Sequence, residues 1–422
     1  MAASEYDSIS LLPSARRLVT SLRDLGYSFP QAVSDLVDNS VAADATSIEI
    51  DLVFAGPDSW LRIVDNGQGM TQSETTEAMR YGAHQEYEDE SLGKFGLGLK
   101  TASLSQCRRL TVVSRRGHGS SRLEARLLDL DHVVAQDSWK ILAPRARQID
   151  GRLREPLRSG SGTVVLWEKL DRLLGYKIQW GRHAERALDA LAEDLREHLG
   201  VVFHRFIEGA IDDRASVQIS VNGEPCLPWD PFALTEPATQ VLSAYDFDVQ
   251  TEEGFGLVRF QPYVLPPRNL FSSEDAFDRA AGPARWNAQQ GLYIYRSNRM
   301  VQSGGWCRLR VRDEHLKLAR ASLDFFPELD AAFEINVAKT RVKLPQSLRP
   351  ELADPVDELA RAAQSRYRNH DRSDAPAAAP GVAQRRARME AAARSVGELR
   401  ALRKIAKQLK KTDPKLAGML GW

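Results

Sequence analysis

The chain has 422 residues, of which 43% are hydrophobic and 27% are charged, and its formal net charge is zero. This length predicts two or three domains, and the composition is typical of a soluble globular protein. No apolar run approaches the roughly 20 residues that cross a bilayer, the N-terminus has no secretion signal, and the distant Cys107, Cys226 and Cys307 match neither a zinc motif nor a disulfide framework. We therefore expect a cytoplasmic protein without membrane association.

The first 210 residues alternate between predicted helices and strands. They contain, in chain order, a helix over 31–45, strands over 48–53, 61–64, 110–114 and 163–167, and a long amphipathic stretch over 184–206. The strand over 48–53 alternates apolar and polar residues, as a half-buried strand does. We predict that residues 1–210 form one domain of helices and strands.

A second unit, residues 211–350, has an α+β pattern. Strands are predicted over 216–221, before the turn Asn222–Gly223, and over 291–295. Helical segments are expected over 308–320 and 324–332. The following stretch, 371–384, is rich in Ala and Pro and is expected to be a linker.

The third region, residues 351–422, ends in a basic tail. From Pro380 to Trp422, eleven Lys or Arg residues accompany three acids, a local net charge of +8, so the rest of the chain carries −8. Apolar residues recur among them at helical spacing, at Val396, Leu399, Leu402, Ile405 and Leu409. Such a tail can bind nucleic acid through backbone phosphates, with an affinity that falls steeply with salt, or it can dock its apolar stripe on a partner or on the protein itself. The sequence leaves both open.

A carboxylate and an amide lie four residues apart in the first predicted helix. Because of this spacing, Asp35 and Asn39 share one helix face. A carboxylate beside an amide oxygen can hold a magnesium ion and orient a water molecule. Taken alone, such a pair is more often part of a solvated helix surface.

A second motif, Asp65-x-Gly67-x-Gly69-Met70, follows the strand over 61–64. Its two glycines would let the backbone approach a flat heterocycle while the Asp65 carboxylate accepts a hydrogen bond from an exocyclic amine. The alternative is a simple Asx turn between a strand and a helix.

A third motif, Gly93-x-x-Gly96-x-Gly98, opens a segment that becomes helical. Backbone N–H groups at a helix N-terminus bind phosphate, assisted by the helix dipole. The spacing matches neither the Walker pattern nor the dinucleotide-binding fingerprint. One glycine-rich loop is weak support, but three motifs in this order and at these spacings are far more specific.

Together the three motifs resemble the ATP-binding fold of the gyrase, heat-shock chaperone, histidine kinase and MutL (GHKL) superfamily. The resemblance implies an α+β protein, with an N-terminal GHKL (Bergerat) α/β sandwich, a transducer-like α+β domain and a basic helical tail. It implies that Asn39 binds Mg²⁺ at the phosphates and that Asp65 accepts the adenine amine, supported by Thr163. It also implies that Lys94 and Lys100 are charge partners of the phosphates, and that residues 81–92 form a mobile lid over ATP. The implied ATP contacts are Asn39, Asp65, Gly67, Gly69, Met70, Gly93, Lys94, Phe95, Gly96, Leu97, Gly98, Lys100 and Thr163.

Two segments of the second unit resemble MORC-type and MutL-type proteins in particular. The stretch over 336–342 is similar to the segment from which those proteins send a lysine to the γ-phosphate, and Lys339 occupies that position, with Arg341 as a secondary candidate. The alternative is an exposed basic turn. Residues 291–301 are similar to a MORC-type hairpin of the second domain.

The chain departs from the family pattern at Asp35, where hydrolysing members usually carry glutamate. Aspartate is one methylene shorter, so a water molecule positioned for in-line attack is held less well. We therefore predict slow ATP hydrolysis, with Asp35 and Lys339 as the catalytic candidates.

The resemblance leads to an ATP-gated clamp as the predicted function. ATP binding would pair two chains through residues 1–15, and the dimer would hold DNA, with the tail from Arg385 to Lys415 as the candidate DNA contact. Two alternatives are a chaperone-like ATPase acting on protein partners and a nucleotide-dependent recruitment module that does not hydrolyse ATP.

Overall fold

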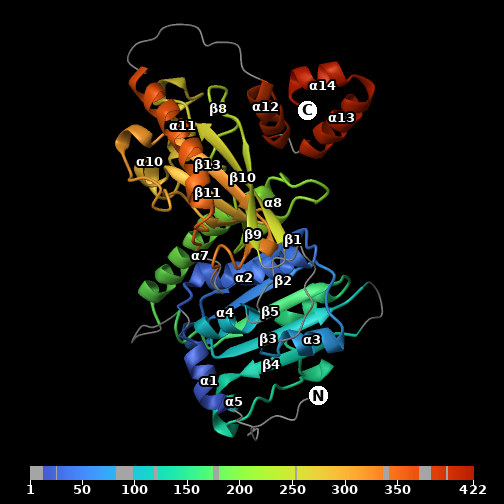
Figure 1. The fold of residues 1–422 in the computed structure, drawn as a ribbon. Coiled ribbons are helices and arrows are strands. Elements are labelled where there is room, and N and C mark those ends of the chain that lie inside the picture. The colour runs from blue at the N-terminus through green and yellow to red at the C-terminus, as the bar shows by residue number, and fades with distance from the viewer. Residues whose placement is uncertain are drawn as a thin grey trace, which may run out of the picture.

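A computed structural model describes residues 13–24, 26–81, 98–117, 122–173, 180–251, 254–335, 342–369, 382–395 and 398–422. The chain folds into two sheet-containing units stacked one on the other, with a small helical unit beside the second (Figure 1). No helix among the described residues has the length and apolarity needed to cross a membrane.

The first unit is built on a seven-stranded sheet in the order β4-β3-β5-β2-β1-β6-β7. Its strands are β1 (Ser47–Val53), β2 (Trp60–Asp65), β3 (Arg109–Arg115), β4 (Glu124–Asp129), β5 (Gly162–Glu168), β6 (Gln218–Val221) and β7 (Glu224–Pro225). Its helices are α1 (Ala15–Leu22), α2 (Phe29–Ala42), α3 (Gln72–Ala78), α4 (Gly98–Gln106), α5 (Leu130–Gln136), α6 (Gly151–Arg154), α7 (Arg182–Val202) and α8 (His204–Ile207), with 3₁₀ turns at Gly56–Asp58, Ala146–Gln148 and Glu155–Leu157.

Helix α2 lies on the side of this unit that faces the second unit (Figure 1), packed against both α4 and α7. It begins with a capping box, in which the Ser28 and Gln31 side chains bond to each other's backbone N–H groups, and Pro30 occupies its first turn. From Ala32 to Val41 every residue is buried except Asn39. Within this stretch Asn39 alone is exposed, and the helix ends on a second exposed residue, Ala42.

The boundary predicted at residue 210 does not coincide with the end of the first sheet. Strand β6 pairs in parallel with β1, and Ile219 and Val221 join the core of the first unit, so this strand belongs to the first sheet and not to the second unit as expected. The alternation of apolar residues identified the strand correctly, but it contains no information about which sheet the strand joins.

The second unit contains a six-stranded sheet in the order β12-β11-β13-β10-β8, with β9 also paired to β10. The strands are β8 (Gln240–Val241), β9 (Tyr245–Thr251), β10 (Gly254–Val264), β11 (Gly291–Arg296), β12 (Arg299–Gln302) and β13 (Ala319–Phe325). The helices are α9 (Glu274–Ala281), α10 (Arg285–Ala288) and α11 (Leu348–Asn369), with 3₁₀ turns at Arg268–Leu270, Glu314–Leu316 and Pro327–Leu329.

The helices expected over 308–320 and 324–332 were wrong. Strand β13 lies between them in sequence, flanked only by single 3₁₀ turns. It pairs with β10 on one side and β11 on the other, and apolar residues alternate along it with polar ones, of which Arg320 and Ser322 are buried. This alternation has the period of a strand and not of a helix.

The C-terminal unit comprises α12 (Val382–Ser395), α13 (Leu399–Thr412) and α14 (Pro414–Leu420). The predicted linker over 371–384 lies outside the described residues as far as residue 381, and α12 begins at Val382. Arginines hold this unit on the protein body: Arg403 pairs with Asp212 and donates to the Ala210 carbonyl at 2.9 Å, and Arg388 donates to the Pro237 carbonyl.

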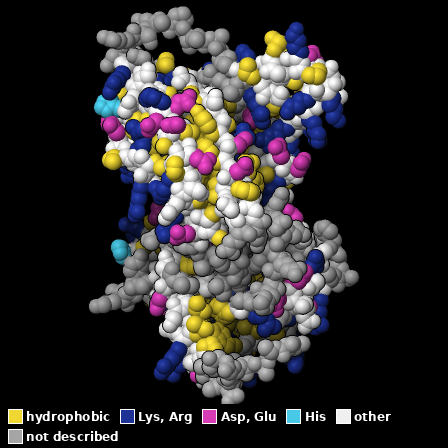
Figure 2. Space-filling model, viewed as in Figure 1, with side chains coloured by type: hydrophobic (Ala, Val, Ile, Leu, Met, Phe, Trp, Pro, Cys, Tyr) yellow, Lys and Arg dark blue, Asp and Glu magenta, His cyan; other side chains and the backbone are white. Residues whose placement is uncertain are grey.

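The lysines of the same unit are exposed to solvent. They are Lys404, Lys407, Lys410, Lys411 and Lys415. Figure 2 shows the basic side chains gathered over these helices, at the upper right. The tail therefore has arginines that dock it on the body, Arg388 and Arg403, and five lysines that remain exposed together with Arg386 and Arg400.

Candidate functional site

The carboxylate of Asp65 forms the best-defined polar centre of the first unit. It lies buried at the end of β2. Its Oδ1 accepts hydrogen bonds from the backbone N–H groups of Gly67 (3.0 Å) and Thr163 (3.1 Å), and its Oδ2 accepts one from the Ser40 hydroxyl (2.9 Å). Burial raises the pKa of Asp65, and these three hydrogen bonds oppose that rise.

A second layer of hydrogen bonds supports this centre through Ser114 of β3. The Ser114 hydroxyl accepts a hydrogen bond from the Met70 N–H (2.8 Å), donates one to the Gly162 carbonyl (2.9 Å) and lies 2.9 Å from the Thr163 hydroxyl. Thr163 thus contacts Asp65 through its backbone and Ser114 through its side chain.

The glycines around Asp65 are required by the close approach of backbone segments. A Cβ at Gly69, whose φ is +68°, would lie 1.8 Å from the Arg115 carbonyl oxygen. A Cβ at Gly67 would lie 2.7 Å from the Ala43 carbonyl oxygen, and one at Gly162 would lie 2.0 Å from the Asp65 carbonyl oxygen. The sequence suggested that the motif glycines make room for a heterocycle; in the structure they first make room for neighbouring backbone.

The Asp35 carboxylate lies one turn before Asn39 on α2 and is held on two sides. Its Oδ2 accepts a 2.8 Å hydrogen bond from the Tyr27 hydroxyl. Burial and the nearby carboxylate raise the pKa of Tyr27 far above its usual value, so this hydroxyl remains a donor. A Cβ at Gly98, the first residue of α4, would lie 3.4 Å from the same oxygen, so the carboxylate faces the end of the glycine motif.

The second unit also reaches Asp35 and its neighbour Asp38. Arg299 of β12 donates from Nε to Asp38 Oδ1 at 2.8 Å, and its Nη2 lies 4.0 Å from Asp35 Oδ1. All three side chains are at most 3% exposed. No sequence motif singled out this arginine, which follows Asp38 by 261 residues.

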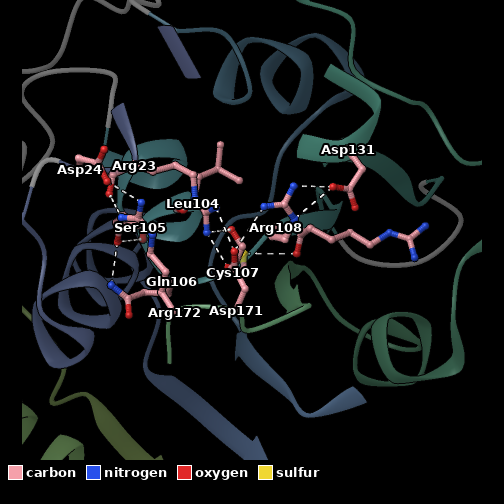
Figure 3. Close-up of polar contacts among 12 residues, drawn as sticks. Arg23, Asp24, Leu104, Ser105, Gln106, Cys107, Arg108, Asp131, Asp171 and Arg172 are labelled. Atoms are coloured by element: carbon pink, nitrogen blue, oxygen red, sulfur yellow. Dashed lines mark hydrogen bonds and ion pairs between the residues drawn. The ribbon is translucent and has the colours of Figure 1, made fainter. Parts of the chain in front are cut away.

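The other end of α4 is anchored by Arg23 (Figure 3). Its Nε donates to the Leu104 carbonyl (2.6 Å), its Nη2 donates to the Cys107 carbonyl (3.4 Å), and its guanidinium pairs with Asp171 (2.6 Å). A cation at the last carbonyls of a helix supplies donors that the helix lacks and complements its dipole. Arg23 therefore fixes the helix whose first residue, Gly98, lies beside Asp35.

The Lys100 side chain contacts protein carbonyls, and its expected role as a charge partner of the phosphates stays a prediction. It is buried, and its Nζ donates to the carbonyls of Ala78 (3.0 Å), the last residue of α3, and of Arg80 (2.7 Å), just beyond it. Those carbonyls need donors at a helix end, which explains the orientation of the lysine. Burial lowers the pKa of Lys100 to about 8.

Several expected site residues lie outside the described part of the chain. They are Gly93, Lys94, Phe95, Gly96, Leu97 and Lys339, together with the lid segment apart from Tyr81. Their roles stay predictions. Among the described ones, α2 contacts the other two motifs directly, because Ser40 bonds to Asp65 and Asp35 borders Gly98.

Four supporting residues were missed by sequence reasoning. Ser40 directly follows Asn39, and Tyr27 directly precedes α2, so both were close to a recognised motif. Ser114 and Arg299 come from β3 and β12, and no local pattern connects either with the site.

Comparison with known proteins agrees with this geometry. Residues 27–163 match the family model described as "Histidine kinase-, DNA gyrase B-, and HSP90-like ATPase". This stretch contains the Asp65 centre, Asp35 and Asn39, but not Arg23, its partner Asp171 or the arginine of the second unit. The N-terminal unit is therefore an ATPase domain of the GHKL superfamily, with affinity to its MORC and MutL members, and ATP binding is the property that this membership supports.

Individual relatives match over shorter stretches. The chain is 32% identical over 85 residues to the ATPase morc-1 of Caenorhabditis elegans, a match that covers 20% of this chain and 10% of that protein. It is 34% identical over 97 residues to the DNA mismatch repair protein MutL of Thermosipho melanesiensis, and 34% identical over 98 residues to that of Thermosipho africanus. Each MutL match covers 22% of this chain and 17% of the relative.

Proposed function

We propose that the protein binds ATP with Mg²⁺, hydrolyses it slowly, and uses ATP-gated dimerisation to control binding to DNA. The proposal applies to this chain the activities that are implied by its family and by the names of the proteins that it matches over part of their length. The Asp65 centre is the observation that carries its first step.

An adenine amine needs a fixed hydrogen-bond acceptor that water does not occupy. The three donors from Gly67, Thr163 and Ser40 hold both oxygens of the Asp65 carboxylate in place inside the protein. A buried acceptor of this kind rejects a ligand without a matching donor, because the lost hydrogen bond is not replaced by solvent. This favours adenine over bases that present a carbonyl at the same position.

The residues present also fit a magnesium ion. Asn39 is the exposed residue within the buried stretch from Ala32 to Val41, and its amide oxygen is a ligand type that Mg²⁺ accepts alongside phosphate oxygens and water. A bound ion would neutralise phosphate charge. Asp35, one turn away, would orient the attacking water and accept its proton.

The basic tail supports DNA as the partner. Five exposed lysines lie on helices that arginines fix to the body, so their charge is presented on a defined surface. Lysine contacts with backbone phosphates give affinity without sequence preference. Pairing of two chains through residues 1–15 belongs to the same proposal, and residues 1–12 lie outside the described part of the chain.

The deciding experiment is analytical ultracentrifugation of the full chain with a non-hydrolysable ATP analogue, with and without duplex DNA. We expect a dimer with the analogue and a larger complex when DNA is added. Binding of the analogue without dimers or DNA complexes would contradict the clamp and favour the recruitment module. Turnover stimulated by unfolded protein, and not by DNA, would favour the chaperone-like alternative.

A further inference from the structure

One buried contact joins the second unit to the proposed hydrolytic residue. Arg299 leaves β12 and enters the first unit, where its guanidinium forms a 2.8 Å ion pair with Asp38 and lies 4.0 Å from Asp35. Asp35 and Asp38 are successive acids on the buried face of α2. The planar guanidinium presents several donors in fixed directions, so one arginine can fix two neighbouring carboxylates, which a lysine cannot do equally well.

The hairpin that carries Arg299 is itself held in place. Its two-residue turn, Ser297 and Asn298, has positive φ values of 45° and 68°, the geometry of a tight β-hairpin. Arg205 of α8 donates to the Asn298 side chain at 3.3 Å and pairs with Asp324 of β13. Arg299 therefore lies in a hairpin that Arg205, from α8 of the first unit, links to β13.

Within the described residues, Arg299 is a cation that the structure places beside Asp35. Its guanidinium lies 5.7 Å from the centre of the Phe203 ring. Burial, with the Arg299 charge as a smaller cause, lowers the pKa of the neighbouring His198 to about 4, so this ring is neutral at physiological pH. On its other side Asp35 is held by Tyr27.

We propose that Arg299 is a positioning residue: it sets the Asp35 carboxylate for water activation only while the second unit is docked on the first, and so makes ATP hydrolysis depend on that docking. This regulation rests on the proposed ATPase function. Movement of the second unit would withdraw the guanidinium and change the position and charge environment of Asp35 without touching the Asp65 centre. Such a movement would change the rate of hydrolysis and leave nucleotide binding unaltered.

The test compares Arg299→Gln, Arg299→Lys and Asp38→Asn with the unaltered chain, measuring the Kd for ATP, KM, kcat and the melting temperature. Arg299→Gln should lower kcat by roughly 10- to 100-fold, the loss that follows from a misplaced reacting group, with Kd and KM changed about twofold at most. Arg299→Lys keeps the charge and should recover part of kcat. Asp38→Asn weakens the anchor of Arg299 and should lower kcat in the same direction.

The matched control is Arg320→Gln, which removes a buried arginine of the second unit at the end of β13 remote from the Ser297–Asn298 turn. Arg320 is fully buried and donates to the carbonyls of Pro231 (2.5 Å) and Ala280 (2.7 Å). Its replacement should lower the melting temperature without a selective loss of kcat below that temperature. An equal kcat loss in Arg320→Gln, or an unchanged kcat in both Arg299→Gln and Asp38→Asn, overturns the positioning role alone.

The unaltered chain separates failure of the inference from failure of the proposed function. If it binds ATP without turning it over, the positioning role is overturned while the nucleotide site stands. If it does not bind ATP, the proposed function fails, and the inference fails with it.

Discussion

The Ser40 hydroxyl donates a 2.9 Å hydrogen bond to Oδ2 of Asp65, and this contact joins helix α2 to the end of strand β2. Both groups are buried, so water cannot replace the bond when it is lost. The contact links the helix that carries Asn39 to the carboxylate proposed to accept the adenine amine.

Replacing Ser40 with alanine should therefore affect both stability and binding. We expect Ser40→Ala to lower the free energy of unfolding by about 1–3 kcal/mol and to weaken ATP binding, because Oδ2 loses its donor. Chemical denaturation and calorimetric titration measure the two effects. Ser34→Ala is the control: Ser34 is buried on the same helix but bonds to the Pro30 carbonyl within it, and its loss should leave ATP affinity unchanged.

The affinity for adenine nucleotides should depend on pH through Asp65. Its pKa is raised by burial, so the carboxylate becomes protonated at a higher pH than an ordinary aspartate. The ionised form accepts the amine, so binding should weaken as pH falls through the raised pKa, by about tenfold for each further pH unit. Titrations across the acid range should show this slope in the unaltered chain and lose it in Asp65→Asn.

The raised pKa of Asp65 also makes the stability of the fold depend on pH, in the opposite direction from ATP binding. The folded carboxyl binds its proton more tightly than the same group in the unfolded chain, where its pKa has the ordinary aspartate value of 3.8. Asp65 therefore contributes stability below that value and loses the contribution as pH rises through the raised pKa. Comparison of the unfolding free energies of the unaltered chain and Asp65→Asn across pH measures this contribution; a difference that grows with pH in favour of the unaltered chain would contradict it.

Alanine substitutions at two glycines with similar φ angles allow backbone strain to be distinguished from a steric clash. Gly69 and Gly117 have φ values of +68° and +74°, but an added Cβ meets the Arg115 carbonyl at Gly69 and meets nothing within 4 Å at Gly117. Gly69→Ala should therefore cost about 1–3 kcal/mol more stability than Gly117→Ala. Equal losses in a denaturant titration would show that the backbone near Arg115 moves away freely.

Asn39 should contribute to Mg²⁺-dependent ATP binding and not to the stability of the fold. Because its side chain is exposed, Asn39→Ala should leave the melting temperature nearly unchanged. In the presence of Mg²⁺ it should weaken ATP binding by about tenfold, which corresponds to about 1.4 kcal/mol. With a chelator present, the variant and the unaltered chain should bind ATP equally; a loss that persists there would assign Asn39 to another contact.

The exposed lysines of α13 should determine the salt dependence of DNA binding. Replacing Lys404, Lys407, Lys410 and Lys411 with glutamate should lower duplex affinity at least tenfold, and should reduce the slope of log affinity against log salt by about 0.9 for each lost phosphate contact. Fluorescence anisotropy over a salt series measures both. Asp212→Asn, which weakens docking of α13 without removing tail lysines, is the comparison. An unchanged slope in the lysine variant would exclude this surface as the DNA contact.

The sequence predicted five strands of the first sheet, all except β4 and β7, because these depend on local alternation, and it singled out Asp65 through a short motif. It did not predict that β6 pairs with β1, because sheet partners are set by tertiary contacts, and it missed β13 although apolar and polar residues alternate along that strand. The contacts of the Lys100 ammonium could not be predicted either, because they are made with carbonyls at the end of α3, which only the folded chain brings close. Arg299 lies far from α2 in sequence, and folding alone brings it to Asp38.

The parallel pairing of β6 with β1 has a consequence for any shortened form of the protein. A piece that stops at residue 210 leaves one side of β1 without its hydrogen-bonding neighbour and uncovers the apolar groups that Ile219 and Val221 shield. An exposed edge strand with unpaired backbone groups promotes association between molecules. An isolated ATPase domain should therefore extend at least through Pro225, beyond residue 210, where the sequence pattern placed the domain boundary.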